Sequence, residues 1–347
     1  MKNRDKMRDM SKKTKESKEA KVYFDEDADI KELKDKIVAV IGYGNQGRSQ
    51  SLNMRDSGVN VIIGNREDEY KEIAEKDEFE VLSIPKACEK ADIIMLLIPD
   101  EIMVEVIDEK VKEHLTEGKV LSFASGYNIA FNLLELPENI DIILLAPRMI
   151  GPGVRELFNE GFYSFIGVHQ DFSKNAKEIV LALAKAIGST RKGVIETTME
   201  QEAHLDLFTE QCFGPAFGQV LMASFQLLKE EGYPVEAILV ELYMSGELSY
   251  TWKRIAKEGF INQMHHHSRT SQYGSISRGM YYAKFMKPIK DQMKEVFDKI
   301  VSGDFTKEWQ KEQRKGEKTL KMLLKSAQRT PLAEVESKVQ EKLRFDE

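Results

Sequence analysis

Three glycines with the spacing Gly42-x-Gly44-x-x-Gly47 follow directly after the apolar run Ile37–Ile41. A short β-branched run that ends in such a turn and opens a helical pattern is typical of dinucleotide binding. The first glycine permits the tight turn, the second lets the backbone approach a pyrophosphate, and the third lets the helix pack close to the strand. The helix N-terminus then faces the phosphates. We therefore expect a nicotinamide or flavin dinucleotide site; a glycine-rich turn in an unrelated α/β protein is the alternative.

A second candidate for chemistry is the acidic stretch Glu196–Glu210, in which Asp206 and Glu210 lie four residues apart. On a helix this spacing puts both carboxylates on one face. Neighbouring carboxylates repel unless a cation or proton lies between them, and hard oxygen ligands suit Mg²⁺. On spacing alone, a solvated acidic face is the simpler explanation. Glu241 lies in the apolar stretch Ala237–Met244, where a carboxylate is costly to bury, so it too suggests a cation.

The elements that must position these residues differ between the two halves of the chain. In the first half, apolar runs at 37–41, 59–64, 93–98, 120–124, 141–145 and 162–168 alternate with helical stretches. This alternation predicts an α/β fold with a parallel, doubly wound sheet, in which ligands bind beyond the carboxyl ends of the strands. The segments at those ends are Gly42-Tyr43-Gly44, Asn65-Arg66, Pro99-Asp100-Glu101, Ser125-Gly126-Tyr127-Asn128 and Pro147-Arg148.

The second half, from Glu200 to about Lys325, is expected to be helical. Apolar residues recur there at intervals of three and four, as in Leu205, Phe208 and Cys212. β-Branched runs are few. We therefore expect an all-helical second domain.

Length and composition fit a soluble enzyme of about two domains, since the chain has 347 residues and 41% hydrophobic residues. A net charge of −7 argues against nucleic-acid binding, and an apolar run of the ~20 residues that a membrane span needs is missing. Two cysteines, Cys88 and Cys212, form no disulfide framework and favour a reducing, cytoplasmic location. Residues 1–21 are lysine-rich and are expected to be a disordered tail.

The chain resembles the short ketol-acid reductoisomerases, which have a single knotted domain. The resemblance extends from Lys21 to about Lys325. Its most specific matches are Gly193–Thr198 and Asp206–Gln211, and Ser268–Gly274 is similar to the segment that closes the family's active site. The remaining matches are 21–29, 41–47, 55–64, 97–101 and 123–129.

The resemblance implies a Rossmann domain over residues 22–197 and an all-helical domain over 198–330 that interlocks with its dimer mate, followed by a tail over 331–347. The family converts 2-acetolactate or 2-aceto-2-hydroxybutyrate to a 2,3-dihydroxy acid in branched-chain amino-acid biosynthesis. Two Mg²⁺ ions promote alkyl migration, and the nicotinamide then reduces the new ketone. The implied partners are a small 2-keto acid and a homodimer or larger even-numbered assembly.

The resemblance also implies roles for individual residues. Asp206 matches the carboxylate that bridges both metals, Glu210 a ligand of one metal, and Glu241 a carboxylate from the partner subunit. Ser268 matches the serine that holds the substrate. Ser125 and Arg148 stand at two further catalytic positions. The implied cofactor-binding residues are Gly42, Tyr43, Gly44, Asn45, Gln46, Gly47, Arg66, Pro99 and Gly126.

Three of these positions depart from the family. Ser125 replaces a histidine, Arg148 replaces a lysine, and Ser245 replaces a second glutamate. Serine cannot relay a proton near neutrality as imidazole does, and arginine lacks the tunable pKa of lysine. Three functions remain open: a working ketol-acid reductoisomerase, a keto-acid reductase that has lost alkyl migration, and a non-catalytic paralogue that binds nucleotide.

The expected cofactor is NADH rather than NADPH. Arg66, which matches the family arginine against the adenine, is followed by Glu67, Asp68 and Glu69. Family members that choose NADPH place serine, lysine or arginine there to hold the 2′-phosphate. Three carboxylates would repel a phosphate dianion and could accept hydrogen bonds from ribose hydroxyls.

Histidines offer two further possibilities. His204, close to Asp206, could replace lost acid–base function, but a structural role is the simpler reading because an offset of two residues points to another helix face. His265-His266-His267 invites a transition-metal reading. Three consecutive side chains on ordinary backbone do not converge on one ion, so we expect no zinc site there.

Overall fold

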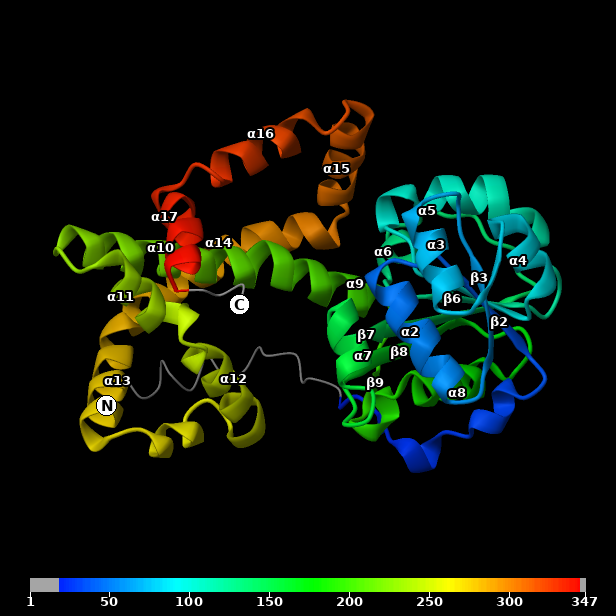
Figure 1. Ribbon diagram of the computed structural model, residues 1–347, viewed down its shortest axis with the longest axis horizontal. Helices are drawn as coiled ribbons and strands as arrows, with labels where there is room; N and C mark the ends of the chain where they lie inside the picture. The colour runs from blue at the N-terminus through cyan, green and yellow to red at the C-terminus, as the bar shows by residue number, and fades with distance from the viewer. Residues whose placement is uncertain (1–18, 344–347) are drawn as a thin grey trace, which may run out of the picture. The chain divides into compact units, whose positions relative to one another are not determined.

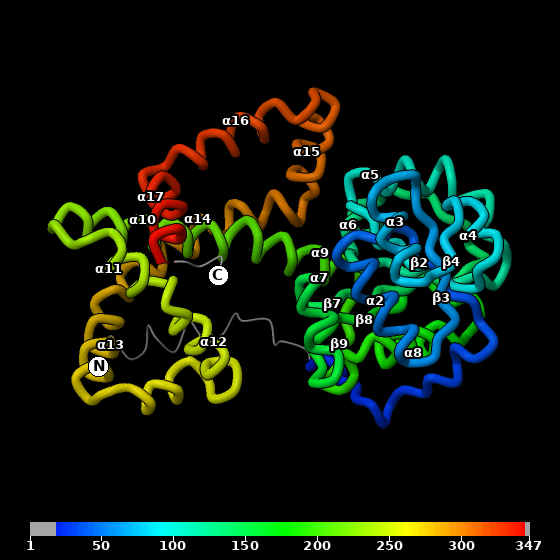
Figure 2. Tube along the Cα trace, viewed as in Figure 1, coloured from blue at the N-terminus to red at the C-terminus, as the bar shows by residue number. Residues whose placement is uncertain are grey.

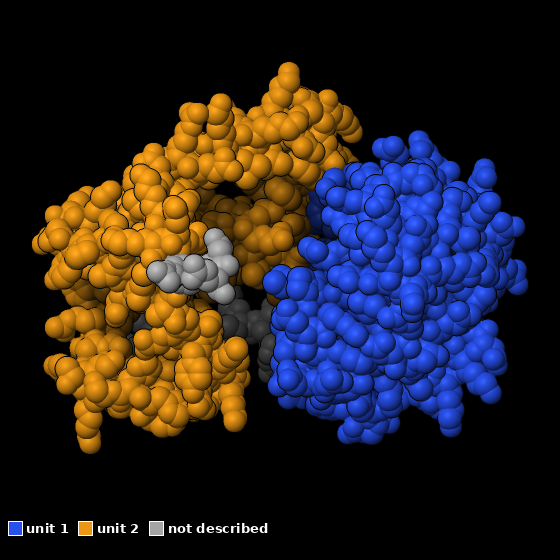
Figure 3. All heavy atoms as spheres, viewed as in Figure 1, with its two compact units in different colours: residues 1–203 blue, residues 204–347 orange. Residues whose placement is uncertain are grey.

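The computed structural model describes residues 19–343, and the chain divides into two compact units, residues 1–203 and 204–347 (Figure 3). The division falls inside helix α9 (Met199–Phe208), whereas we expected the second domain to begin at residue 198. Most of the expected N-terminal tail, up to residue 18, lies outside the described residues. None of the described helices is long and apolar enough to cross a membrane.

Unit 1 is built on a sheet, several strands of which are labelled in Figure 1. Its described strands have the order β1-β9-β8-β7-β6-β5-β2-β3-β4. Strands β2 to β7, in the middle and at one edge, pair in parallel. The bounds are β1 Val22–Tyr23, β2 Ile37–Ile41, β3 Asn60–Gly64, β4 Glu80–Leu82, β5 Ile93–Leu96, β6 Val120–Phe123, β7 Asp141–Pro147, β8 Ser164–Gln170 and β9 Val194–Glu196.

The predicted doubly wound sheet is confirmed, because both faces of the sheet are covered. Val38 and Val40 of β2 join a core with helices α2 (Asn45–Asp56) and α8 (Ala176–Ile187). The intervening Ala39 and Ile41 join a second core on the other face, with helices α4 (Ile84–Lys90) and α5 (Asp100–Val106). Alternate residues of a strand point to opposite faces, so a β-branched run without polar residues fits a strand buried on both sides.

Two details of the sheet differ from the prediction. Strand β8 runs antiparallel to β7, and β1 antiparallel to β9, so the sheet is mixed rather than wholly parallel. An apolar run has the same pattern in either direction and therefore does not encode strand polarity. Strands β1, β4 and β9 were also missed, since each is only two or three residues long.

Unit 2 is helical, as predicted, and Figure 2 traces its path. Its α-helices after α9 are α10 Gly214–Glu230, α11 Val235–Leu239, α12 Glu247–Glu258, α13 Arg269–Tyr282, α14 Met286–Val301, α15 Asp304–Arg314, α16 Lys318–Ala327 and α17 Pro331–Lys342.

Helix α17 occupies most of the segment that we expected to be a tail. Its Leu332 and Val339 pack with Phe225, Ile238 and Leu239 in a buried cluster. The two apolar side chains lie seven residues apart, on one face of the helix, so the segment has a surface to bury.

Candidate active site

The glycine-rich turn has the geometry that its sequence predicts. Gly42 has φ +94°, and a Cβ there would lie 2.8 Å from the carbonyl oxygen of Leu97. A Cβ on Gly47 would lie 2.1 Å from the carbonyl oxygen of Gly42. Gly44, which precedes the first residue of α2, has no such neighbour within 4 Å. Two glycines therefore allow tight packing, and the third leaves open space beside a helix N-terminus, where a phosphate can approach.

The side chains of the turn hold it in place. Tyr43 is buried, and its hydroxyl donates to Asp77 Oδ2 (2.9 Å), which also accepts from Arg48 Nε (2.7 Å). Burial and the hydrogen bond to Asp77 raise the pKa of the Tyr43 phenol, so it remains protonated. Gln46 Nε2 donates to the Met149 carbonyl (2.8 Å) and so ties the turn to the segment after β7.

A cavity of about 340 Å³ lies beside the turn and is lined by Tyr43, Gly44, Asn45, Arg48, Tyr70 and Arg155, among others. It lies next to the open N-terminus of α2 and carries two guanidinium groups. The helix dipole favours an anionic ligand there. The two arginines are already paired with Asp77 and Asp56, and Glu156 also lines the cavity.

The segment after β3 is organised by one carboxylate. Asp68 Oδ1 accepts from Asn65 Nδ2 (2.8 Å) and from the N–H groups that begin helix α3 (Glu69–Lys76). Its Oδ2 accepts from Arg66 Nε (2.6 Å). Although partial burial acts in the opposite direction, the hydrogen bonds from Arg66 and Asn65 lower the pKa of Asp68. Arg66, predicted to lie against the adenine, is thereby anchored while its side chain stays largely exposed.

The other two carboxylates of this segment, Glu67 and Glu69, differ in their contacts and exposure. Glu67 forms an ion pair with Lys71 (2.8 Å), and Glu69 is exposed. The ion pairs offset part of the negative charge on which the predicted choice of NADH depends. The segment still carries one more carboxylate than it has cations among Arg66 and Lys71.

Arg148, at the end of β7, is fixed by a carboxylate that the sequence analysis missed. Its Nη2 lies 3.0 Å from Oε1 of Glu202, whose side chain is 1% exposed. Glu202 Oε2 accepts the backbone N–H of Gly126 (2.6 Å). One buried carboxylate thus joins the ends of β6 and β7, two of the predicted ligand-binding segments. Ser125 is half-buried beside them, and its Oγ accepts the N–H of Tyr127 (3.2 Å).

A signal for Glu202 was present in the sequence. It lies three residues after Met199 and next to Ala203, both of which are buried on the same side of α9. An acidic residue at a position of the apolar helical period cannot belong to a solvated face, and a buried charge needs partners. A Cβ on Gly126 would lie 2.1 Å from the Met199 carbonyl oxygen, so α9 and this turn pack in direct contact.

The candidate metal ligands of unit 2 lie at irregular points of its helices. Asp206 is half-buried near the end of α9, and Glu210 is exposed in the π-helical turn Thr209–Phe213 that follows. Glu241 lies in a second π-helical turn, Val240–Met244. Such turns are rare in proteins as a whole, but many of those that occur lie at functional sites.

Among residues 19–343 of a single chain, the structure does not bring together a three-ligand group of Asp206, Glu210 and Glu241. The side chain of Glu241 is exposed in the single chain, although the sequence around it is apolar. The π-helical turn changes the angle between successive side chains, so its neighbours Ile238 and Leu239 enter the core without it.

The remaining predicted residues lie at the ends of helical segments, between a strand and a helix, or against an aromatic ring. Ser268 is the N-cap of α13, and its hydroxyl accepts the N–H of Ser271 (3.2 Å). Ser245 ends the second π-helical turn and is exposed. Pro99 lies between β5 and α5 at the carboxyl end of the sheet. The His204 ring packs edge-on against Phe297, with ring centroids 6.3 Å apart, which favours the structural role that we expected.

The glycine-rich turn at the carboxyl edge of a doubly wound sheet, followed by a helical unit, defines the class as NAD(P)-dependent oxidoreductases. A family model described as acetohydroxy acid isomeroreductase, NADPH-binding domain, matches residues 32–193. A second, described as ketol-acid reductoisomerase, C-terminal domain, matches residues 199–345. The chain therefore belongs to the ketol-acid reductoisomerase family, and it is an enzyme of that oxidoreductase class. The predicted resemblance is confirmed.

Individual relatives agree with this assignment. The ketol-acid reductoisomerase (NADP(+)) of Methanopyrus kandleri is 40% identical over 94% of this chain and 100% of its own length. That of Methanococcus maripaludis is 40% identical over 92% of this chain and 97% of its own length. A solved structure of an NADH-preferring ketol-acid reductoisomerase from an uncultured archaeon superposes with a TM-score of 0.87, at 33% identity, over 92% of this chain and 98% of that one.

Proposed function

We propose that this enzyme converts 2-acetolactate or 2-aceto-2-hydroxybutyrate to the 2,3-dihydroxy acid of branched-chain amino-acid biosynthesis. The observation that carries the proposal is the carboxylate pair Asp206 and Glu210 on one stretch of helix, in a chain that matches the family through both domains. Carboxylate oxygens are the donors that Mg²⁺ prefers, so these residues and Glu241 fit the ion. When bound, Mg²⁺ supplies Lewis-acid polarisation of the substrate oxygens, and the nicotinamide supplies hydride.

The residues of unit 1 contribute binding and orientation. The N-terminus of α2 beyond Gly44 holds the pyrophosphate, and Arg66 provides a surface for the adenine. Arg148 presents a positive charge whose position is fixed by Glu202. It therefore attracts an anionic substrate group but relays no proton. Ser268 offers a hydroxyl proton to the substrate, since its oxygen is already occupied as an acceptor by Ser271.

The second candidate is a reductase of the same fold without alkyl migration. It is favoured by the Arg148–Glu202 ion pair, which holds a fixed charge where the family has a titratable lysine, together with Ser125 and Ser245. An assay of the purified chain with Mg²⁺ and each nicotinamide cofactor separates the candidates. Turnover of 2-acetolactate supports the first. Turnover of only the rearranged 3-hydroxy-2-keto acid supports the second, and turnover of neither contradicts both.

The same proposal extends to cofactor, assembly and location. NADH is preferred because the segment after β3 retains an excess of carboxylate.

The assembly is a dimer or a larger even-numbered oligomer, since Glu241 is exposed and most exposed large apolar side chains of the described residues belong to unit 2. Buried thiols at Cys88 and Cys212 suit the reducing cytoplasm. A monodisperse monomer that is active at nanomolar concentration would contradict the assembly.

A further inference from the structure

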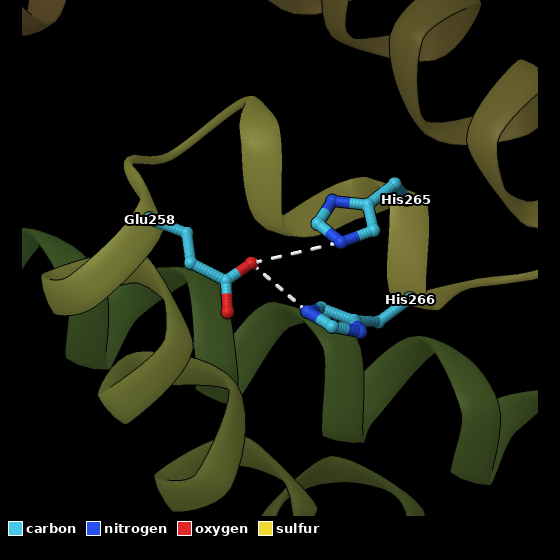
Figure 4. Close-up of side chains that lie close together, drawn as sticks. All are labelled: Glu258, His265 and His266. Atoms are coloured by element: carbon cyan, nitrogen blue, oxygen red, sulfur yellow. Dashed lines mark hydrogen bonds and ion pairs between the residues drawn. The ribbon is translucent and has the colours of Figure 1, made fainter.

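A cluster of metal-ligand side chains lies in unit 2 outside the residues discussed for catalysis. Glu258 is the last residue of α12, and His265 and His266 lie in the 3₁₀ turn Asn262–His266 that follows (Figure 4). Gly259, with φ +92°, lets the chain reverse between them. The reversal brings both imidazoles back to the carboxylate. The three histidines do not all converge, but two of them meet a carboxylate that the sequence analysis did not count, so we revise our expectation that no zinc site lies there.

The distances fit one ion. The Nε2 atom of His266 lies 2.9 Å from Glu258 Oε2, and the Nε2 atom of His265 lies 3.9 Å from the same oxygen. The three ligand atoms all lie within 4.8 Å of one another. Tetrahedral zinc, with bonds of about 2.0–2.2 Å, holds neighbouring ligand atoms roughly 3.3 Å apart. Small side-chain rotations therefore suffice to close the group on an ion.

The surrounding hydrogen bonds orient the ligands. The Nδ1 atom of His265 bonds the carbonyl oxygen of Asn262. Because a carbonyl only accepts, Nδ1 carries the proton and Nε2 keeps a lone pair directed at Glu258. Arg254 Nη1 donates to the other carboxylate oxygen, Glu258 Oε1 (3.0 Å), and leaves Oε2 to the histidines. Metal-binding histidines and carboxylates are typically oriented by such outer contacts.

The third histidine provides an internal contrast. His267 Nε2 lies 3.2 Å from Gln263 Oε1 rather than near Glu258. It is adjacent in sequence and of the same chemistry, yet it lies outside the cluster. His267 is half-buried whereas His265 and His266 are exposed, so the chain directs only two of the three imidazoles to Glu258.

We propose that Glu258, His265 and His266 bind a divalent transition metal of the zinc class, with water completing the coordination. Two imidazoles and one carboxylate select such an ion over Mg²⁺, which prefers oxygen ligands alone. The ion fastens the end of α12 to the turn before Ser268, the N-cap of α13. The proposal concerns unit 2 by itself and does not depend on the proposed reaction.

The test is calorimetric titration of the full chain with Zn²⁺ while Mg²⁺ is present in excess. We expect a Zn²⁺ site whose affinity falls at least about tenfold in His266→Ala and in Glu258→Gln and stays unchanged in His267→Ala. The site should persist in Asp206→Asn, which separates it from the catalytic metals.

A spectroscopic measurement makes the result independent of how the variants fold. Co²⁺ added to the unaltered chain should give visible absorption typical of nitrogen-containing coordination, and Zn²⁺ should displace it. Absence of Zn²⁺ binding in excess Mg²⁺, or equal losses in His267→Ala and His266→Ala, would overturn the proposal. Loss of the site in Asp206→Asn would likewise overturn it, by assigning the binding to the carboxylates of the catalytic site.

Discussion

Unit 1 and unit 2 differ in how much of their candidate site one chain completes. In unit 1, a sheet with a core on each face holds the glycine-rich turn, and Glu202 joins the segments that contain Gly126 and Arg148. In unit 2, Asp206, Glu210 and Glu241 do not gather within the described chain, and many large apolar side chains are exposed. Unit 1 thus completes its cofactor surface within one chain, whereas unit 2 leaves candidate ligands and apolar side chains exposed, which is the basis of the proposed oligomer.

The largest expected effect is a loss of metal-dependent turnover when Asp206 of unit 2 is changed. Asp206→Asn should abolish metal-dependent turnover and weaken Mg²⁺ binding by about tenfold or more, because an amide replaces a charged oxygen ligand. Calorimetry and a steady-state assay measure the two quantities. Glu295→Gln, an exposed change on α14, is the matched control. Unchanged Mg²⁺ binding and turnover would show that Asp206 is not a metal ligand.

Glu202→Gln tests the self-contained unit. A glutamine leaves its NH₂ group facing either Arg148 or the Gly126 N–H, both of which are donors. We expect a loss of about 2 kcal/mol in the free energy of unfolding, reduced from the cost of a fully buried pair because Arg148 is partly exposed. Denaturant unfolding followed by circular dichroism measures it.

The control for this variant is Glu178→Gln, an exposed change in the first turn of α8. It should leave the unfolding free energy within about 0.5 kcal/mol. If both variants were equally stable, the carboxylate would not be what joins the ends of β6 and β7.

A smaller effect is expected on the preference for NADH over NADPH, which depends on residues of unit 1. NADH should bind more tightly than NADPH, and Glu69→Lys should narrow the difference by adding a cation and removing a carboxylate near the 2′-phosphate. Competitive titration at low ionic strength, where repulsion is greatest, measures this preference. Glu89→Lys, on α4, should leave the ratio of affinities unchanged. Tighter NADPH binding by the unaltered chain would reverse our assignment.

The smallest effect is expected at His204. His204→Ala should change turnover less than about threefold, because the ring packs against Phe297 and we assign it no proton transfer. A general acid or base typically contributes 10²–10⁴-fold in rate. A loss of that size, with fold and cofactor affinity preserved, would mean that His204 has taken over the function missing at Ser125.

The sequence by itself determined the elements that depend on local pattern. The β-branched run before Gly42 and the glycine spacing predict a strand, a tight turn and a helix N-terminus, and the structure confirms each. Four-residue spacing predicts that Asp206 and Glu210 share one helix face; the structure has them on consecutive α- and π-helical turns. Family motifs predicted the class of enzyme. These features are encoded within about ten consecutive residues, where chain geometry alone relates one side chain to the next.

Only the tertiary structure decided what depends on chain direction and on distant partners. Strand β8 is antiparallel although its apolar pattern has no polarity. Glu202 joins the ends of β6 and β7 because Gly126 and Arg148, more than fifty residues away, contact it. Glu258 meets His265 and His266 because the chain reverses at Gly259. In each case packing brings the partners together. Packing depends on side chains that are far apart in the sequence, so a short stretch of sequence does not reveal it.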